Sequence, residues 1–293
     1  MPDLYRTFQL NVQKHHLFEG NDQVILGISG GVDSITLANL LVRYFENPKQ
    51  HIVLAHVDFH LREDSNNETQ VVKDFALHNN LVLETTDWSK VSENGIENAA
   101  RVFRYDFYKK VAEKYQTKKI VLAHHANDQA ETILLKLARG GDWRQFKGMS
   151  FTRDMGHLTI VRPLLTVSKN EILEYAKENN LNWYDDYTNF DPEYTARNLI
   201  RNQVLPELTS INENAVENIA NFGGWLSDLE NNQLPEMLRI WLTETAPDLP
   251  IKESQLQDFS HLLENPKKPH GSLNLSDKKT LVKNNGSIDL KNN

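Results

Sequence analysis

Short β-branched runs alternate with helical patterns from residue 24 to about residue 165, and this alternation restricts the chain to few folds. Expected strands are Val24–Ile28, Ile52–Val57, Leu81–Thr85, Ile120–His124 and Leu158–Val161, with helices near residues 34–46, 65–79, 96–116 and 128–139. Such alternation is typical of βαβ units, in which helices join parallel strands and cover both faces of the sheet. We therefore predict an α/β fold with a doubly wound, mostly parallel sheet.

The pattern changes after Pro206, where helical segments and Asn-rich stretches are followed by short strand-like pieces. A chain of 293 residues suits a catalytic domain of roughly 200 residues with a smaller appendage. We predict a first domain at residues 1–209 and a second, smaller, mainly helical or α+β domain at residues 210–293.

Composition narrows the possible function classes. The chain has no cysteine, no apolar stretch long enough to span a bilayer and no export-like segment near Met1. These features exclude a disulfide scaffold, cysteine-bound metals and sulfur transfer by a protein cysteine, and they predict a cytoplasmic protein without a membrane span. The net charge of −8 suits nucleic acid poorly, but basic residues concentrate between Arg101 and Lys119.

A glycine-containing loop follows the first expected strand and precedes an apolar helix. It consists of Ser29, Gly30, Gly31, Val32, Asp33 and Ser34. Glycines allow a tight turn, and backbone amides at a helix start bind anions. The spacing fits neither the Walker A motif nor the dinucleotide fingerprint. We predict a phosphate-binding loop; the alternative is a tight turn without chemical meaning.

A second motif, His124 to Thr132, ends the fourth strand and opens the next helix. Because ligands bind beyond the carboxyl ends of parallel strands, this motif should share a cleft with the Ser29–Ser34 loop. Asp128 and Glu131, three residues apart, are expected opposite the apolar side of the helix, facing away from the core. Alternatively, the acids only favour the helix dipole and His124 is a satisfied core residue.

Arginine pairs could bind the phosphates of a nucleic acid. Arg197 and Arg201 are four apart in an expected helix, and Arg101 and Arg104 form another pair. In the alternative interpretation, Arg197 and Arg201 instead form ion pairs that hold the end of the domain. The candidate partners are Asp185, Asp186 and Asp191.

The Ser29–Ser34 loop resembles the PP-loop of the N-type ATP pyrophosphatases, which are adenine nucleotide alpha hydrolase-like enzymes. They cleave ATP between its α and β phosphates and adenylate a substrate. Further segments resemble one subfamily, the tRNA(Ile)-lysidine synthases: Asn98–Tyr105, His124–Thr132, Arg139–Gly141, Arg162–Leu165 and Arg197–Arg201. This resemblance covers residues 24–206 and is weak beyond them.

The resemblance implies an ATP-dependent carbon–nitrogen ligase that joins free L-lysine to C2 of the wobble cytidine in the CAU-anticodon isoleucine tRNA. The products would be lysidine, AMP and pyrophosphate, with Mg²⁺ as the metal. By resemblance, Ser29, Gly30, Gly31, Val32, Asp33 and Ser34 bind ATP, and Asp33 also binds the metal. Catalytic roles fall to Asp33, Arg104, His124 and Arg197, lysine binding to Asp128 and Glu131, and tRNA binding to Arg101 and Arg201. The oligomeric state, including a homodimer, stays open.

The chain departs from the family pattern at three positions. Phe59 and His60 stand where the family usually has His and Gly, so the backbone conformation of that loop is open. Asn127 replaces the first Asp of a pair, which indicates that no charge is needed there. Alternative functions are another adenylating PP-loop enzyme, such as a tRNA cytidine thiolase or an ammonia-using amide synthetase, and a non-catalytic nucleotide- or RNA-binding module.

Overall fold

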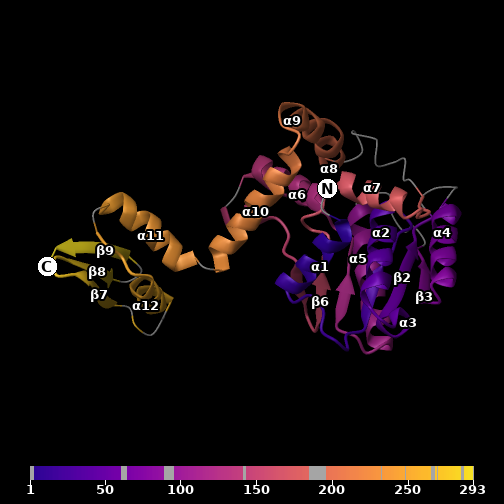
Figure 1. Cartoon of the computed structure of the whole chain (residues 1–293), viewed down its shortest axis with the longest axis horizontal. Helices are drawn as coiled ribbons and strands as arrows, with labels where there is room; N and C mark the ends of the chain where they lie inside the picture. The colour runs from indigo at the N-terminus through magenta and orange to yellow at the C-terminus, as the bar shows by residue number, and fades with distance from the viewer. Residues whose placement is uncertain are drawn as a thin grey trace. The chain divides into compact units, whose positions relative to one another are not determined.

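The computed structural model describes residues 3–60, 65–88, 96–140, 143–184, 196–231, 233–247, 249–264, 268, 270–284 and 287–292. The chain forms two compact units, Met1–Gly223 and Gly224–Asn293 (Figure 1). The division falls after the expected boundary at residues 209 and 210. The reason is that Val216 and Ala220, on α10 (Ala215–Asn231), pack with Ala126 and Ala130 in one apolar cluster of the first unit.

Six of the described strands form the central sheet, in the order β3-β2-β1-β4-β6-β5. Their bounds are β1 (Val24–Gly27), β2 (Ile52–Asp58), β3 (Val82–Asp87), β4 (Lys119–Val121), β5 (Thr152–Met155) and β6 (Leu158–Val161). All neighbouring pairs are parallel except β5 and β6, which are antiparallel. The prediction of a mostly parallel α/β sheet is confirmed.

Helices cover both faces of this sheet, as the alternating pattern predicts. The described α-helices between Leu4 and Glu178 are α1 (Leu4–Lys14), α2 (Val32–Tyr44), α3 (Pro48–His51), α4 (Ser65–His78), α5 (Ile96–Lys114), α6 (Ala126–Arg139) and α7 (Lys169–Glu178). On one face, Phe8, Leu37 and Ile172 bring α1, α2 and α7 into a shared core with the strands. On the other, Tyr108 and Val111 of α5 join a separate cluster. Burial of this apolar surface is the main stabilising contribution.

The strand order places a switch point between β1 and β4. The chain runs outward from β1 through β2 to β3, then returns to place β4 on the other side of β1. In open parallel sheets, the crevice beyond the carboxyl ends of strands at such a point binds ligands. The Ser29–Ser34 loop follows β1 and His124 follows β4, so both lie at this crevice.

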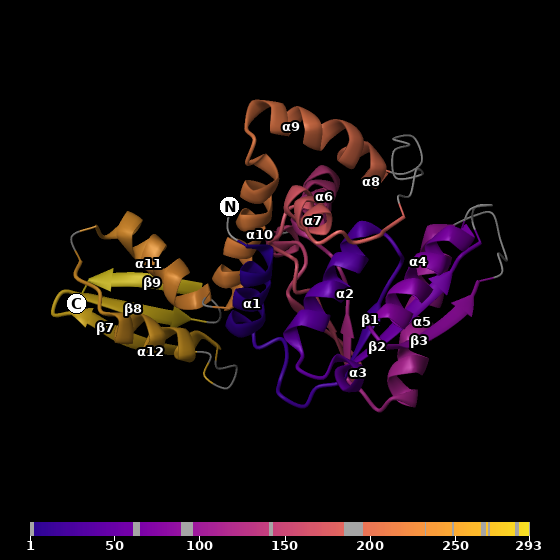
Figure 2. The ribbon, with the colours of Figure 1, turned by 45° about the vertical axis from the view of Figure 1, so that its right-hand side comes forward.

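A further helical run lies along α6. It comprises α8 (Ala196–Leu199), a π-helical turn (Ile200–Val204) and α9 (Leu205–Ile211), which Figure 2 shows as one continuous ribbon above α6. Ile200 and Leu205 pack with Ala126 and Ala130 of α6. This packing brings Arg197 and Arg201 of the run beside Glu131 of α6.

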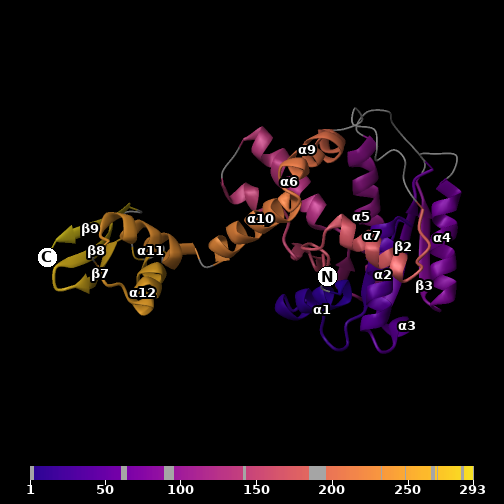
Figure 3. The same cartoon turned by 45° about the horizontal axis from the view of Figure 1, so that its top comes forward.

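The second unit contains α11 (Gln233–Thr245), α12 (Glu253–Glu264) and an antiparallel sheet of β7 (His270–Ser276), β8 (Lys279–Asn284) and β9 (Ser287–Asn292), all labelled in Figure 3. Leu242, Phe259 and Leu281 are fully buried in its core. A short 3-10 helix, Trp143–Lys147, belongs to the first unit. Among the described residues, no helix combines the length and apolar character needed to cross a membrane.

Candidate active site

A pocket opens at the carboxyl edge of the sheet, beside the switch point. Its lining includes Ser29 and Ser34 of the loop after β1, and His124 from the turn after β4. The expected sharing of one cleft by these two motifs is confirmed. Apolar side chains of Val57 and Phe59 line another part, together with polar groups from several helices, namely Asp33, Glu68, Arg104 and Tyr105.

The Ser29–Ser34 loop has a shape that suits a phosphate group. Gly30 has φ +85°, and a Cβ there would lie 2.9 Å from the carbonyl oxygen of Glu68, so the backbone requires glycine. Gly31 is the N-cap of α2 and has no side chain to cap the first-turn amides, which are therefore suited to an anion. The Ser29 amide donates to Ser34 Oγ at 3.1 Å, which closes the loop. These features fit ATP.

Asp33, in the first turn of α2, contacts two basic side chains. Lys169 Nζ lies 2.6 Å from Asp33 Oδ1, and His125 Nε2 lies 3.6 Å from Asp33 Oδ2. Burial alone would raise the pKa of Asp33, but His125 and Lys169 lower it below its usual value. The carboxylate is therefore ionised and is a suitable oxygen ligand for Mg²⁺. No sequence pattern marked Lys169 or His125 as its partners, because Lys169 lies 136 residues away along the chain.

His124 lies in the pocket with most of its side chain enclosed. Burial, aided by the positive charges of Arg162, Arg197 and Arg104, lowers the pKa of His124 to about 4, against the opposing effect of Asp128. The imidazole is therefore neutral at pH 7. Its Nδ1 is buried and finds no hydrogen-bond partner among the residues that the structure describes. A buried polar atom in that state suits a ligand that supplies the missing bond.

The two acids of α6 are bound by two arginines of the neighbouring helical run. Arg197 Nε and Arg201 Nε donate to opposite carboxylate oxygens of Glu131, at 2.5 and 2.6 Å. Arg197 Nη2 also donates to Asp128 Oδ1 at 3.0 Å. Glu131 is 0 % exposed and Asp128 is 14 % exposed at their side chains, so of the two acids only Asp128 keeps accessible surface.

This arrangement differs from the expectation that both acids face away from the core. The run from α8 through the π-helical turn covers this side of α6, and the arginines supply the compensating charge. Burial would raise the pKa of Asp128, but the charges of His125 and Arg197 and the hydrogen bond from the His125 amide hold that pKa far below its usual value. The expected alternative partners Asp185, Asp186 and Asp191 lie outside the described residues. Arg101 and Arg104, both exposed, lie on α5, and Arg101 stacks over the Tyr105 ring at 5.5 Å.

The pairing of Arg201 predicts a stability effect. Arg201→Ala removes one of the two guanidinium groups that compensate the charge of the fully buried Glu131. The free energy of unfolding should therefore fall by about 3 kcal/mol. The measurement is urea denaturation followed by circular dichroism. Lys109→Ala, which breaks the exposed Lys109–Asp106 pair, is the matched control and should cost less than about 1 kcal/mol. Equal, small losses in both variants would show that the buried pairing contributes little.

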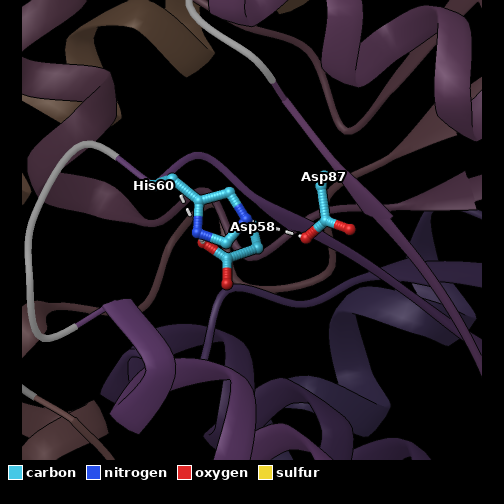
Figure 4. Close-up of side chains that lie close together, drawn as sticks. All are labelled: Asp58, His60 and Asp87. Carbon is cyan, nitrogen blue, oxygen red and sulfur yellow. Dashed lines mark hydrogen bonds and ion pairs between the residues drawn. The ribbon is translucent and has the colours of Figure 1, made fainter.

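The unusual residues at the end of β2 keep a backbone conformation that glycine favours. His60 has φ +44°, and its ring lies between two carboxylates, with Nδ1 3.4 Å from Asp58 Oδ1 and Nε2 2.9 Å from Asp87 Oδ1 (Figure 4). The His60 amide also donates to Asp58 Oδ1 at 3.0 Å. Potential cation ligand atoms of these three residues lie within 4.8 Å of one another, but each ring nitrogen already faces a carboxylate. These contacts offset the left-handed strain at His60.

Asn127 accepts a backbone hydrogen bond, and this interaction requires no charge. Its Oδ1 accepts a hydrogen bond at 2.9 Å from the backbone amide of Lys169, the first residue of α7. A carboxylate oxygen could accept the same bond, and an amide oxygen is sufficient. The uncharged Asn127 therefore makes a contact between the starts of α6 and α7.

Known proteins resemble this chain in sequence. A model of the PP-loop domain matches residues 4–208. The chain is 39% identical over 226 residues to the tRNA(Ile)-lysidine synthase of Lactiplantibacillus plantarum, covering 76% of this chain and 50% of that protein. It is 32% identical over 281 residues to the tRNA(Ile)-lysidine synthase of Enterococcus faecalis, covering 95% of this chain and 60% of that protein. The chain thus spans about half the length of these relatives.

A solved structure supports the fold. The U34-tRNA thiolase NcsA from Methanococcus maripaludis superposes with a TM-score of 0.64 at 14% identity, covering 76% of this chain and 78% of that one. At this identity the likeness concerns the fold alone. The family match covers most of the first unit and includes the loop, the switch point and the α6 acids. The chain belongs to the PP-loop domain family.

Proposed function

We propose that this chain converts the wobble cytidine of the CAU-anticodon isoleucine tRNA to lysidine, using ATP and free L-lysine. The observation that carries the proposal is a phosphate-type loop that is connected, through Asp33 and His125, to Asp128, a partly exposed acid capable of binding an amine. Asp33 lines the pocket, and His125 lies 3.6 Å from Asp33 and 3.5 Å from Asp128. The names of the two bacterial relatives support the same reaction. Its cellular setting would be the cytoplasm, where both substrates occur.

The chemistry explains the need for ATP. The C2 oxygen of cytosine is a poor leaving group, so an amine does not displace it directly. Transfer of AMP from ATP to this oxygen releases pyrophosphate and activates C2. The ε-amine of lysine then attacks C2, a C–N bond forms, the C–O bond breaks, and AMP leaves with the oxygen.

The residues of the pocket divide this work. Amides of the Ser29–Ser34 loop would bind pyrophosphate oxygens, and the apolar wall with Val57 and Phe59 would receive the adenine. Asp33 would ligate Mg²⁺, which neutralises phosphate charge when bound. Arg104 would stabilise negative charge that develops on the α-phosphate.

His124 is better suited to hydrogen bonding than to proton removal. A carboxylate near an ammonium group favours the protonated amine, whereas the attacking amine must be neutral. With its pKa lowered to about 4, His124 is a weak base at neutral pH. We assign it to a hydrogen bond with the reacting groups. Asp128 would bind an amino group of lysine, while Glu131 and Arg197 hold Asp128 in place.

The tRNA contact can be tested on α5. Arg101 is exposed and would bind a phosphate, as would Arg201 if tRNA draws it from Glu131. Arg101→Ala should weaken tRNA binding and reduce the slope of log affinity against log salt by nearly one unit, or somewhat less for a single strand. Lys49→Ala, an exposed cation on α3 before β2 and so at the opposite edge of the sheet, is the control. Filter binding across salt concentrations is the measurement. Equal slopes in the wild type, Arg101→Ala and Lys49→Ala would show that Arg101 does not contact the tRNA.

A pyrophosphate-release assay separates the proposal from its alternatives. Protein, ATP and Mg²⁺ are incubated with unmodified isoleucine tRNA, with or without lysine. We expect release to require the tRNA and net turnover to require lysine. Turnover with ammonia or a sulfur donor in place of lysine would favour another adenylating enzyme. Nucleotide or RNA binding without any pyrophosphate release would indicate a binding module.

A further inference from the structure

Lys169 joins α7 to the carboxylate of the PP-loop. Its Nζ lies 2.6 Å from Asp33 Oδ1, and Asp33 lines the pocket. The side chains remain 34 % and 29 % exposed, so the pair is accessible to a ligand in the pocket. The ammonium group of Lys169 therefore competes with a metal ion for Asp33 Oδ1.

The backbone that carries Lys169 is held firmly. The Lys169 amide donates to Asn127 Oδ1 at 2.9 Å, and the Ala126 amide donates to the Val167 carbonyl at 2.8 Å. Ser168 and Glu171 form a capping box that starts α7, as the sequence pattern predicts. The start of α7 is therefore fixed against the start of α6, while the four-carbon side chain of Lys169 can still change its direction.

The location of Lys169 is electrostatically unusual. It is the first residue of a helix, where the macrodipole favours acidic side chains and disfavours a cation. The starts of α2, α6 and α7 converge here, since Asp33, His125 and Lys169 belong to or adjoin those starts. Helix starts attract anions, and Asp33 alone would repel a phosphate chain that approaches them.

We propose that Lys169 is a mobile phosphate ligand, which neutralises Asp33 in the nucleotide-free protein and moves to the β and γ phosphates when ATP binds. Its departure exposes Asp33 to Mg²⁺, so one lysine serves both states. This inference rests on the proposed function only in that ATP binds at the Ser29–Ser34 loop. A static tie between α2 and α7 is the competing explanation, and it predicts that removing the ammonium group of Lys169 changes the affinities for ATP and AMP equally or not at all.

The first test compares ATP with AMP by isothermal titration calorimetry, without tRNA or lysine. Lys169→Met keeps the length of the side chain and removes its charge. Loss of a charged hydrogen bond should weaken ATP binding about tenfold or more and leave AMP binding nearly unchanged. Lys177→Met, an exposed lysine on the same helix, should bind both nucleotides as the wild type does.

The second test uses Mn²⁺ binding to the nucleotide-free protein, followed by electron paramagnetic resonance. Lys169→Met removes the competing ammonium group, so the affinity for Mn²⁺ should rise about threefold to tenfold. Lys169→Arg keeps a cation and should retain the ATP preference. Lys169→Gln, which also removes the charge, serves as the test variant if Lys169→Met does not fold. A static tie would lower thermal stability without the selective loss of ATP affinity.

The outcomes separate this inference from the proposed function. Wild-type protein that binds neither ATP nor AMP would contradict the proposed function itself. Wild-type protein that binds ATP, together with a Lys169→Met variant whose ATP and AMP affinities change equally or not at all, would overturn the role of Lys169 alone. Unchanged Mn²⁺ affinity in Lys169→Met would show that the ammonium group does not compete for Asp33.

Discussion

Gly30→Val should reduce pyrophosphate release by about a hundredfold or more, while the sheet stays folded. A Cβ at Gly30 would lie 2.9 Å from the Glu68 carbonyl oxygen, and φ +85° is a conformation that valine avoids. The loop must therefore shift, and its amides lose their alignment with the phosphates. The measurements are pyrophosphate release and circular dichroism.

Gly156→Val is the matched control for this change. Gly156 has φ +68°, but a Cβ there would meet nothing within 4 Å, and the residue lies between β5 and β6. Both variants therefore carry similar backbone strain, of about 1–2 kcal/mol, and only Gly30→Val disturbs the loop. Unchanged ATP turnover in Gly30→Val would show that the Ser29–Ser34 loop does not bind the nucleotide.

Asp128→Asn should raise the apparent KM for lysine about tenfold to a hundredfold, with little change in ATP binding. The substitution keeps the shape of the side chain and removes the charge that would bind an ammonium group, worth about 1.5–3 kcal/mol. In the wild type, Asp128 Oδ2 accepts a hydrogen bond from the His125 backbone amide at 3.1 Å. The amide oxygen of asparagine can accept the same bond, so the start of α6 should persist. Steady-state kinetics with varied lysine and varied ATP is the measurement.

Two comparisons make the Asp128 result specific. Asp154→Asn changes an exposed acid on β5 and should leave both constants at wild-type values. Thermal melting of Asp128→Asn shows whether loss of the Arg197 ion pair at 3.0 Å also loosens α6. An unaltered lysine requirement combined with failed adenylation would assign Asp128 to the nucleotide or the metal.

Local sequence patterns were sufficient to predict the parallel strands of the sheet. Alternating apolar runs and helical periods depend on neighbouring residues, so the parallel strands and the capping box at Ser168 could be predicted. The antiparallel strand β5, Thr152–Met155, could not, because its exposed, polar residues lack an alternating pattern. The helix α1, Leu4–Lys14, precedes the βαβ pattern and was not predicted either.

The site was predictable only where its residues are adjacent in the sequence. The Ser29–Ser34 loop and the α6 acids could be recognised as motifs, and strand order brings them to one edge. The contacts of Lys169 with Asp33 and of Arg201 with Glu131 join residues 136 and 70 positions apart. No local pattern contains such a contact, and the burial of Glu131 that results from it could not be inferred from helical spacing.

The most direct measurement of the central claim is the identity of the nucleoside product. Protein, ATP, Mg²⁺, isotopically labelled lysine and unmodified isoleucine tRNA are incubated, and the digested tRNA is analysed by mass spectrometry. We predict that the wobble cytidine gains the mass of lysine less one water, with the label retained, and that Gly30→Val yields no such product. A wobble cytidine of unchanged mass, or one modified without the lysine label, would contradict the account.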